Sequence, residues 1–196
     1  MEIIGEIQPG APLLVVAVHH EAEHLDTDLP ILITGVGKLA ASRAVLGALA
    51  PMVVEERPGL LINLGSAGAL RDGIEGTHVV GTLLQHDLDG PAIAAMVGVD
   101  PSPPIVVGEG LTLATGDRFI ADPHERRRLG EVAHLVDMEG YAVASAAEAL
   151  DLDLIVIKHV SDHADGEAQD TWIDAVALSS KELSSWLAEH HGRGDD

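Results

Sequence analysis

The sequence contains no cysteine, few basic residues and no long apolar run, and each shortage excludes a class of protein. Without cysteine the chain can form neither a disulfide bond nor a thiolate metal site. No apolar run approaches the roughly 20 residues that a membrane-spanning helix requires. Since the first residues also lack a basic segment followed by a long apolar one, we expect no signal peptide and a cytoplasmic location. The 196 residues are expected to form one domain, 1–196, with a large core.

The charge balance is strongly acidic, because 32 aspartate and glutamate residues outnumber 11 lysine and arginine residues and give a net charge of −21. Such a surface repels nucleic acids and anionic membranes, so we expect neither as a partner. It also disfavours a polyanionic substrate, and a neutral small molecule fits better. The alternative that the acidity only keeps the protein in solution stays open.

Short apolar runs alternate with helix-like segments along the chain. The run at residues 154–160 is nearly continuous, as in strands that a parallel sheet buries on both faces. Asp122 before Pro123 is typical of a helix start. This alternation predicts βα units around a mostly parallel sheet. The predicted strands are residues 13–18, 31–33, 60–64, 77–84, 105–114 and 154–160, and the predicted helices are residues 38–50, 138–150 and 167–190.

Polar or glycine-rich segments follow four of the predicted strands. Ligands of open α/β sheets bind beyond the carboxyl ends of the strands, so we expect these segments to meet at one pocket. The four segments are residues 19–21, 35–38, 65–68 and 161–162.

Residues 20–24 read His-Glu-Ala-Glu-His and match the zinc-protease pattern H-E-x-x-H. That chemistry needs both histidines on one stable helix together with a third ligand. Here the motif directly follows a strand, and Pro30 interrupts the chain soon afterwards. We therefore expect no catalytic zinc, and at most adventitious metal binding by His19, His20 and His24.

Two glycine-rich segments each have a structural and a functional interpretation. Residues 35–38, Gly-Val-Gly-Lys, suggest a phosphate loop but lack the G-x-x-x-x-G-K-[ST] spacing, because Leu39 follows Lys38. A tight strand-to-helix turn explains them, and the helix start could still hold a ligand oxygen. Residues 65–68, Gly-Ser-Ala-Gly, are either a turn or a strand end where a ligand approaches the backbone closely.

Two acidic segments lie about one strand–helix unit apart, at Asp137 to Glu139 and at Ser161-Asp162. Two carboxyl groups with opposed protonation needs are the usual signature of an acid–base pair. Each segment also has a plain structural explanation. The first could be the acidic first turn of a helix, where the helix dipole favours carboxylates, and the second could be a cap. The residues alone leave both interpretations open.

Taken together and in order, these segments resemble the nucleoside phosphorylase and nucleosidase superfamily, most closely its 5'-methylthioadenosine/S-adenosylhomocysteine nucleosidases. One block alone is weak evidence for this family, whereas seven blocks in the same order as in the family are specific evidence. The blocks are residues 17–21, 35–38, 63–68, 85–87, 115–120, 136–139 and 157–162. The resemblance implies a three-layer α/β/α fold with a mostly parallel or mixed twisted sheet. It also implies a homodimer that binds a nucleoside and uses no metal or organic cofactor.

The resemblance assigns catalytic roles to three carboxylic acids. Asp162 matches the aspartate that protonates purine N7, and Ser161 matches the residue that helps to hold it. Glu139 matches the glutamate that binds the ribose hydroxyls, with Met138 packing on the sugar. Glu21 matches the glutamate that activates water. A carboxylic acid normally loses its proton well below neutral pH, so the first role requires Asp162 to be desolvated or hydrogen-bonded.

The resemblance also implies a set of substrate-binding residues. Ser66 and Lys158 match the groups that position the water, Phe119 matches the aromatic ring that stacks on the base, and the Ile120 backbone would read the edge of the base. Lys158 replaces the arginine that is usual in this family, and a point charge cannot orient water as a planar guanidinium does. Two further members of the predicted binding set, Gly68 and Val36, lie in the glycine-rich blocks.

The charges near these blocks indicate whether water or phosphate is the nucleophile. Phosphorylases of the superfamily place arginines around phosphate, whereas Asn63-Leu64-Gly65 carries no cation and Glu21 would repel a phosphate dianion. We therefore expect a purine nucleosidase that hydrolyses an adenosine-type nucleoside. A phosphorylase, a futalosine-type hydrolase and a non-catalytic nucleoside-binding protein are the alternatives. Compared with the family, the chain is shortened between residues 89 and 105 and between residues 21 and 31, so the 5' substituent stays undefined.

Overall fold

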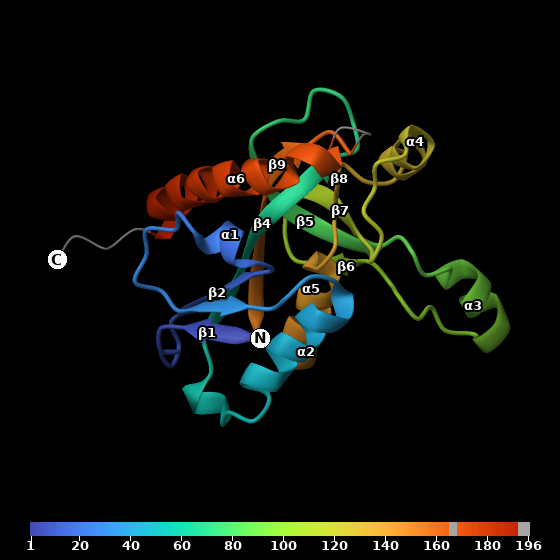
Figure 1. The fold of residues 1–196 in the computed structure, drawn as a ribbon. Helices are drawn as coiled ribbons and strands as arrows, with labels where there is room; N and C mark the ends of the chain where they lie inside the picture. Colours follow the sequence, from blue (N-terminus) through green and yellow to red (C-terminus); the bar gives the residue numbers. More distant parts are fainter. Residues whose placement is uncertain (165–167, 192–196) are drawn as a thin grey trace.

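The computed structural model describes residues 1–164 and 168–191, and in the last helix it describes the side chains of residues 175–190. Within this part of the chain, nine strands form one mixed sheet (Figure 1). The strands are β1 (Glu2–Ile4), β2 (Pro12–Val16), β3 (Ile31–Ile33), β4 (Leu60–Ala69), β5 (Thr77–Gln85), β6 (Ile105–Val106), β7 (Leu111–Thr115), β8 (Leu135–Asp137) and β9 (Asp153–Asp162). The helices are α1 (His19–Ala22), α2 (Lys38–Leu49), the 3-10 turn Val54–Glu56, α3 (Gly90–Val97), α4 (Pro123–Gly130), α5 (Gly140–Ala149) and α6 (Ala168–His191).

Five of the strands close into a ring. Strand β4 runs parallel to β9, β9 antiparallel to β5, and β5 and β8 both parallel to β7. Strand β8 then returns to β4, where Val136 pairs with Gly68. A shift in register between Ala67 and Gly68 separates the last two residues of β4, which pair with β8, from the rest of the strand. The first half of β4 pairs with β2, and β3 and β1 extend the sheet outward from there.

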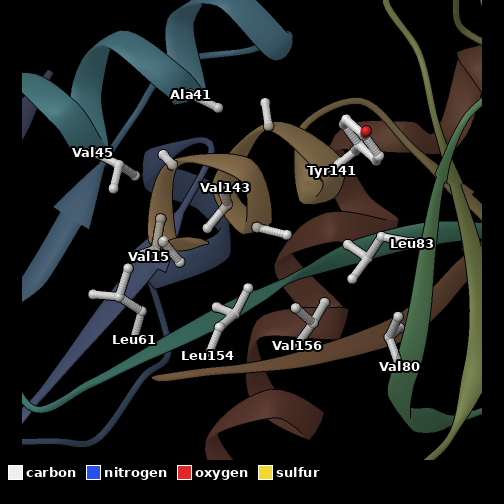
Figure 2. Packing of buried hydrophobic residues seen from close by; sticks show 14 of the residues in the cluster. Val15, Ala41, Val45, Leu61, Val80, Leu83, Tyr141, Val143, Leu154 and Val156 are labelled. Atoms are coloured by element: carbon white, nitrogen blue, oxygen red, sulfur yellow. The ribbon is translucent and has the colours of Figure 1, made fainter. Parts of the chain in front are cut away.

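Helices cover both faces of the sheet (Figure 1). Helices α2 and α5 pack together on one face, and α6 packs with α1 on the other. Figure 2 shows the core beneath α2 and α5, where Val45, Val143 and Leu61 lie among other apolar side chains. Helix α5 is rich in alanine, and its small buried side chains let it approach the sheet closely. The predicted α/β fold with helices on both sides of a mixed sheet is confirmed.

Most predicted elements agree with the structure to within a few residues, but one predicted strand was wrong. Residues 105–114 do not form one strand, because β6 pairs antiparallel and β7 parallel with β5, so the chain reverses direction between them. Of the two interpretations of residues 65–68, the strand end is the one observed, since β4 continues through them to Ala69 and they line a pocket. Helix α3 was not predicted, although Asp89 caps it by accepting a hydrogen bond from the Ala92 N–H at 3.1 Å.

No helix in the described ranges is both long and apolar enough to cross a bilayer.

Candidate active site

A pocket of about 590 Å³, its open mouth included, lies where the carboxyl ends of β4, β8 and β9 meet. Strand ends and the segments that follow them supply its walls. Every predicted site residue except Lys158 lines this pocket. These residues are Glu21, Val36, Ser66, Gly68, Phe119, Ile120, Met138, Glu139, Ser161 and Asp162.

Glu21 is buried at the inner end of the pocket, on the short helix α1. Its Oε2 accepts hydrogen bonds from the N–H groups of Ala17 at 2.8 Å and Val18 at 3.3 Å. Its Oε1 accepts from the Ser66 N–H at 2.9 Å and from the Ser66 Oγ at 3.3 Å. These donors compensate the cost of burying a carboxylate and fix its direction. Ser66 thus directly contacts Glu21, the predicted general base.

The histidines around Glu21 do not form the site that the H-E-x-x-H pattern suggests. Helix α1 ends at Ala22, so His20 and His24 do not share a helix. Both side chains are exposed, whereas Glu21 points inward. Among the residues that the structure describes, no group of three or more histidine, aspartate or glutamate side chains could hold a metal ion.

A buried ion pair lies directly behind the pocket wall. The Lys158 ammonium is 2% exposed and lies 2.9 Å from Oδ2 of Asp137. Burial alone would lower the pKa of Lys158, but the carboxylates of Asp137, Glu21 and Glu139 outweigh burial and raise it. A Cβ on Gly65 would lie 3.0 Å from both Glu21 Oε1 and Lys158 Nζ, so glycine leaves room for these charges beside the strand.

The resemblance gave Lys158, among the substrate-binding residues, a part in positioning the water. Its ammonium lies behind the pocket wall, bonded to Asp137. Asp137 stands at the end of β8, and its carboxylate meets the ammonium of Lys158 from β9. Lys158 is therefore placed to hold carboxylates in position and not to contact a ligand.

The Asp137 carboxylate also organises the start of α5. Its Oδ1 accepts a hydrogen bond from Thr115 Oγ1 at 2.6 Å, and its Oδ2 accepts from the Gly140 N–H at 2.8 Å. Thr115 Oγ1 in turn accepts from the Tyr141 N–H at 3.0 Å. Two successive backbone groups after Glu139 are thereby fixed, which sets the direction of the Glu139 side chain.

Glu139 is the N-cap residue of α5 and is half-buried in the pocket. Its Oε1 accepts a hydrogen bond from the Gly37 N–H at 2.7 Å. Burial and the neighbouring charge of Asp137 raise the pKa of Glu139 to about 8, against the opposing effects of the Gly37 N–H and Lys158. This carboxyl group therefore changes its charge near neutral pH.

The segment Gly35 to Lys38 is the tight strand-to-helix turn that was predicted as one interpretation. Gly37 has a φ of +93°, and a Cβ there would lie 3.0 Å from Asp117 Oδ1. Glycine is thus required at this position for the turn to approach both Asp117 and Glu139. The backbone N–H at the start of α2 binds the oxygen of Glu139, so this turn is not a phosphate loop.

Asp162 ends β9 and is held at both of its oxygens. Oδ2 accepts a hydrogen bond from Ser161 Oγ at 2.8 Å, and Oδ1 accepts from the Ala164 N–H at 2.7 Å. Ser161 thus contacts Asp162, as expected from the resemblance. Ala164 is fully buried with a φ of +49°, a left-handed conformation that costs on the order of 1 kcal/mol in a non-glycine residue. The fold stores this strain where it fixes the acid.

The remaining wall of the pocket is largely apolar. Phe119, the only phenylalanine in the sequence, lines it with Ile120, Val136 and Met138. A flat aromatic face beside aliphatic side chains suits a planar heterocycle. Arg118 also lines the pocket, and sequence reasoning missed it. Its side chain is 66% exposed and lies 3.8 Å from Glu125, and only its place next to Phe119 could have indicated it.

Comparisons with known proteins agree with this site and fold. The family model of the phosphorylase superfamily matches residues 102–189. A 5'-methylthioadenosine/S-adenosylhomocysteine nucleosidase of Staphylococcus aureus is 27% identical over 185 residues, which cover 80% of this chain and 79% of that protein.

Two solved structures from Helicobacter pylori share the fold. One is a 5'-methylthioadenosine/S-adenosylhomocysteine nucleosidase with butyl-thio-DADMe-Immucillin-A, at a TM-score of 0.77 and 18% identity over 94% of this chain and 98% of that chain. The other is a futalosine hydrolase, at a TM-score of 0.75 and 20% identity over 92% of this chain and 96% of that chain. The chain is thus similar to the phosphorylase superfamily in sequence and shares the fold of its nucleosidases, in agreement with the resemblance.

Proposed function

We propose that this protein is a purine nucleosidase that hydrolyses the N-glycosidic bond of an adenosine-type nucleoside. The observation that carries the proposal is the meeting of Asp162, Glu139 and Glu21 in one pocket beside an apolar, aromatic wall. A purine leaves readily once its ring is protonated, and the sugar then passes through a cationic, oxocarbenium-like transition state. Carboxylates around that cation stabilise it electrostatically.

Each acid has a distinct part in this reaction. Asp162 donates a proton to N7 of the base, which lies against Phe119, and Ser161 keeps the acid oriented. Glu139 accepts hydrogen bonds from the ribose hydroxyls, and Met138 packs on the sugar. Glu21 draws a proton from the attacking water. General acid–base assistance of this kind contributes typically ~10²–10⁴-fold to the rate.

Water, not phosphate, is the proposed nucleophile. Phosphate would need cations at the sugar, but Lys158 is bound to Asp137 and Lys38 contacts Asp87 and Gln85. Arg118, the one cation in the described lining of the pocket, lies beside Phe119 and is directed toward Glu125. Beside the nucleophile position, the buried Glu21 carboxylate would repel a dianion. The charge distribution therefore supports hydrolysis.

The nucleophile is tested with a panel of purine nucleosides that differ at the 5' position, each assayed with and without phosphate. The panel includes 5'-methylthioadenosine, S-adenosylhomocysteine and futalosine, because the similar proteins are named for them. We expect free base and free sugar at rates that do not depend on phosphate. Phosphate-dependent release of ribose 1-phosphate, or tight binding of every nucleoside without turnover, would contradict the proposal.

We also propose that the protein is a homodimer. Helix α3 and the residues after it carry apolar side chains that the single chain leaves exposed: Met96 at 76%, Val97 at 66% and Val99 at 67%. A second copy would remove this apolar surface from water. Sedimentation equilibrium should give twice the mass of the 20.5 kDa chain. Met96→Asp should shift the mass toward the monomer, and Val53→Asp, at another exposed apolar position, should not.

A further inference from the structure

A cluster of charged side chains joins three segments close to the pocket residues Val36 and Arg118. The Lys38 ammonium donates a hydrogen bond to Gln85 Oε1 at 2.6 Å and contacts Asp87 Oδ1. The Lys38 backbone N–H donates to Asp117 Oδ1 at 2.8 Å, and the Asp117 N–H donates to Asp87 Oδ2 at 2.8 Å. These residues come from the start of α2, the end of β5 and the segment after β7, so the cluster ties three separate parts of the chain together.

The cluster adjoins the segments that contact or carry two predicted substrate-binding residues, Glu139 and Phe119. Gly37, directly before Lys38, donates its N–H to Glu139. Asp117 is separated from Phe119 only by Arg118. The position of the ribose-binding acid and that of the base-stacking ring therefore depend on the same charged contact.

Charge balance makes Lys38 the central member of the cluster. Its ammonium lies between two acids, in contact with Asp87 and 3.9 Å from Asp117 Oδ2. The side chains of Lys38 and Asp87 are only 18% and 20% exposed, so water screens them weakly. Burial alone would raise the pKa of Asp87, but the hydrogen bonds from Lys38 and from the Asp117 N–H lower it. Without the ammonium, the neighbouring carboxylates of Asp87 and Asp117 would have no cation between them.

We infer that Lys38 is a positioning residue. Its contacts with Asp87 and Asp117 hold the Gly37 N–H against Glu139 and fix the position of Phe119 relative to Glu139. The inference rests on the proposed nucleosidase function and assigns the Gly-Val-Gly-Lys turn to the alignment of sugar and base. Glu139 acts as a carboxylate in this scheme, because an ionised group accepts hydrogen bonds from both ribose hydroxyls.

The first test compares Lys38→Met with Lys181→Met, which removes a charge from an exposed position on α6. Lys38→Met should lower kcat/KM by about 10–100-fold, since small misplacements of binding groups have effects of this size. The double variant Lys38→Met/Asp87→Asn should recover part of the loss, because it removes one of the facing charges. Lys181→Met should match the wild-type protein.

The second test uses pH, because a merely structural role would not move a pKa. The charged and polar groups facing Glu139 are Asp137 from β8, Lys158 from β9, Glu21 from α1 and the Gly37 N–H from the turn before α2. In the wild-type protein kcat/KM should rise with pH and level off above about 8, as Glu139 loses its proton. Loss of the Gly37 hydrogen bond should move this midpoint upward by about one pH unit in Lys38→Met.

The same shift can be measured without turnover. Because the folded protein raises the pKa of Glu139, its contribution to stability is present below the ordinary range of a glutamate and is lost as pH rises through about 8. Urea unfolding from pH 5 to 9 should show this loss in the wild-type protein and not in Glu139→Gln. In Lys38→Met, the unfolding free energy should continue to fall to a higher pH than in the wild-type protein.

These measurements separate the two proposals. Wild-type protein that releases no base from any nucleoside defeats the proposed function, while the urea series still tests the position of Gly37 on Glu139. An unchanged pH midpoint in folded Lys38→Met, by kinetics or by unfolding, overturns the positioning role even if the variant melts at a lower temperature.

Discussion

Replacement of Asp162 by asparagine is expected to lower kcat for base release by about 10²–10⁴-fold, with little change in nucleoside binding. Asparagine keeps the size of the side chain and can still meet Ser161 Oγ and the Ala164 N–H, but its amide has no acidic proton for N7. The base must then leave as an anion, which is a much poorer leaving group. The expected loss thus falls on the chemical step and not on binding.

Single-turnover release of base and equilibrium binding of the nucleoside measure the two parts separately. The matched control is Asp153→Asn, which makes the same change at the exposed first residue of the same strand, far along β9 from the pocket. Turnover of Asp162→Asn within a factor of a few of the wild-type rate would remove the general acid from the mechanism. Loss of binding without loss of kcat would make Asp162 a binding residue instead.

Replacement of Lys158 by methionine is expected to reduce the free energy of unfolding by about 3–5 kcal/mol. Lys158 is the only fully buried cation among the described residues, and its removal leaves the carboxylate of Asp137 without its ion-pair partner, next to Glu21 and Glu139. An uncompensated charge in the interior costs far more than the lost contact. Since the pKa of Lys158 is raised, its contribution persists at neutral pH and is lost only under strongly alkaline conditions.

Urea unfolding at neutral pH measures this effect. The double variant Lys158→Met/Asp137→Asn removes both charges of the pair and should regain a large part of the lost stability. Lys181→Met, an exposed substitution of the same kind, should change the unfolding free energy by no more than about 0.5 kcal/mol. A loss below about 1 kcal/mol in Lys158→Met would mean that the pair is not needed for the fold.

Much of the site could be predicted from sequence because its residues follow strands. Glu21 and Asp162 lie at or soon after strand ends, where an apolar run gives way to polar residues, and such ends meet at one edge of a sheet. The order of the strands is also constrained by the βα alternation. Motifs at strand ends therefore carry spatial information that isolated residues do not.

The features that sequence reasoning left open or missed have physical causes of a different kind. Lys158 lies within β9, where alternation alone does not say whether a long side chain reaches the pocket or a buried acid behind it. The strand character of residues 65–68 depends on pairing with β9 and β8, which are distant in sequence. The reversal between β6 and β7 likewise follows from their pairing with β5. Long-range contacts decided these features against local propensity.

The closed ring of β4, β9, β5, β7 and β8 limits how the enzyme can admit a nucleoside and discharge its products. Parting any two of these strands would break backbone hydrogen bonds on a circle that has no free edge, so the framework that carries Ser66 and Asp162 stays rigid during a catalytic cycle. Entry and exit must then be governed by the connections above the ring, at residues 35–38, 86–87 and 116–119. We therefore expect the motions that admit a nucleoside and release its products to occur in those connections and not in the sheet.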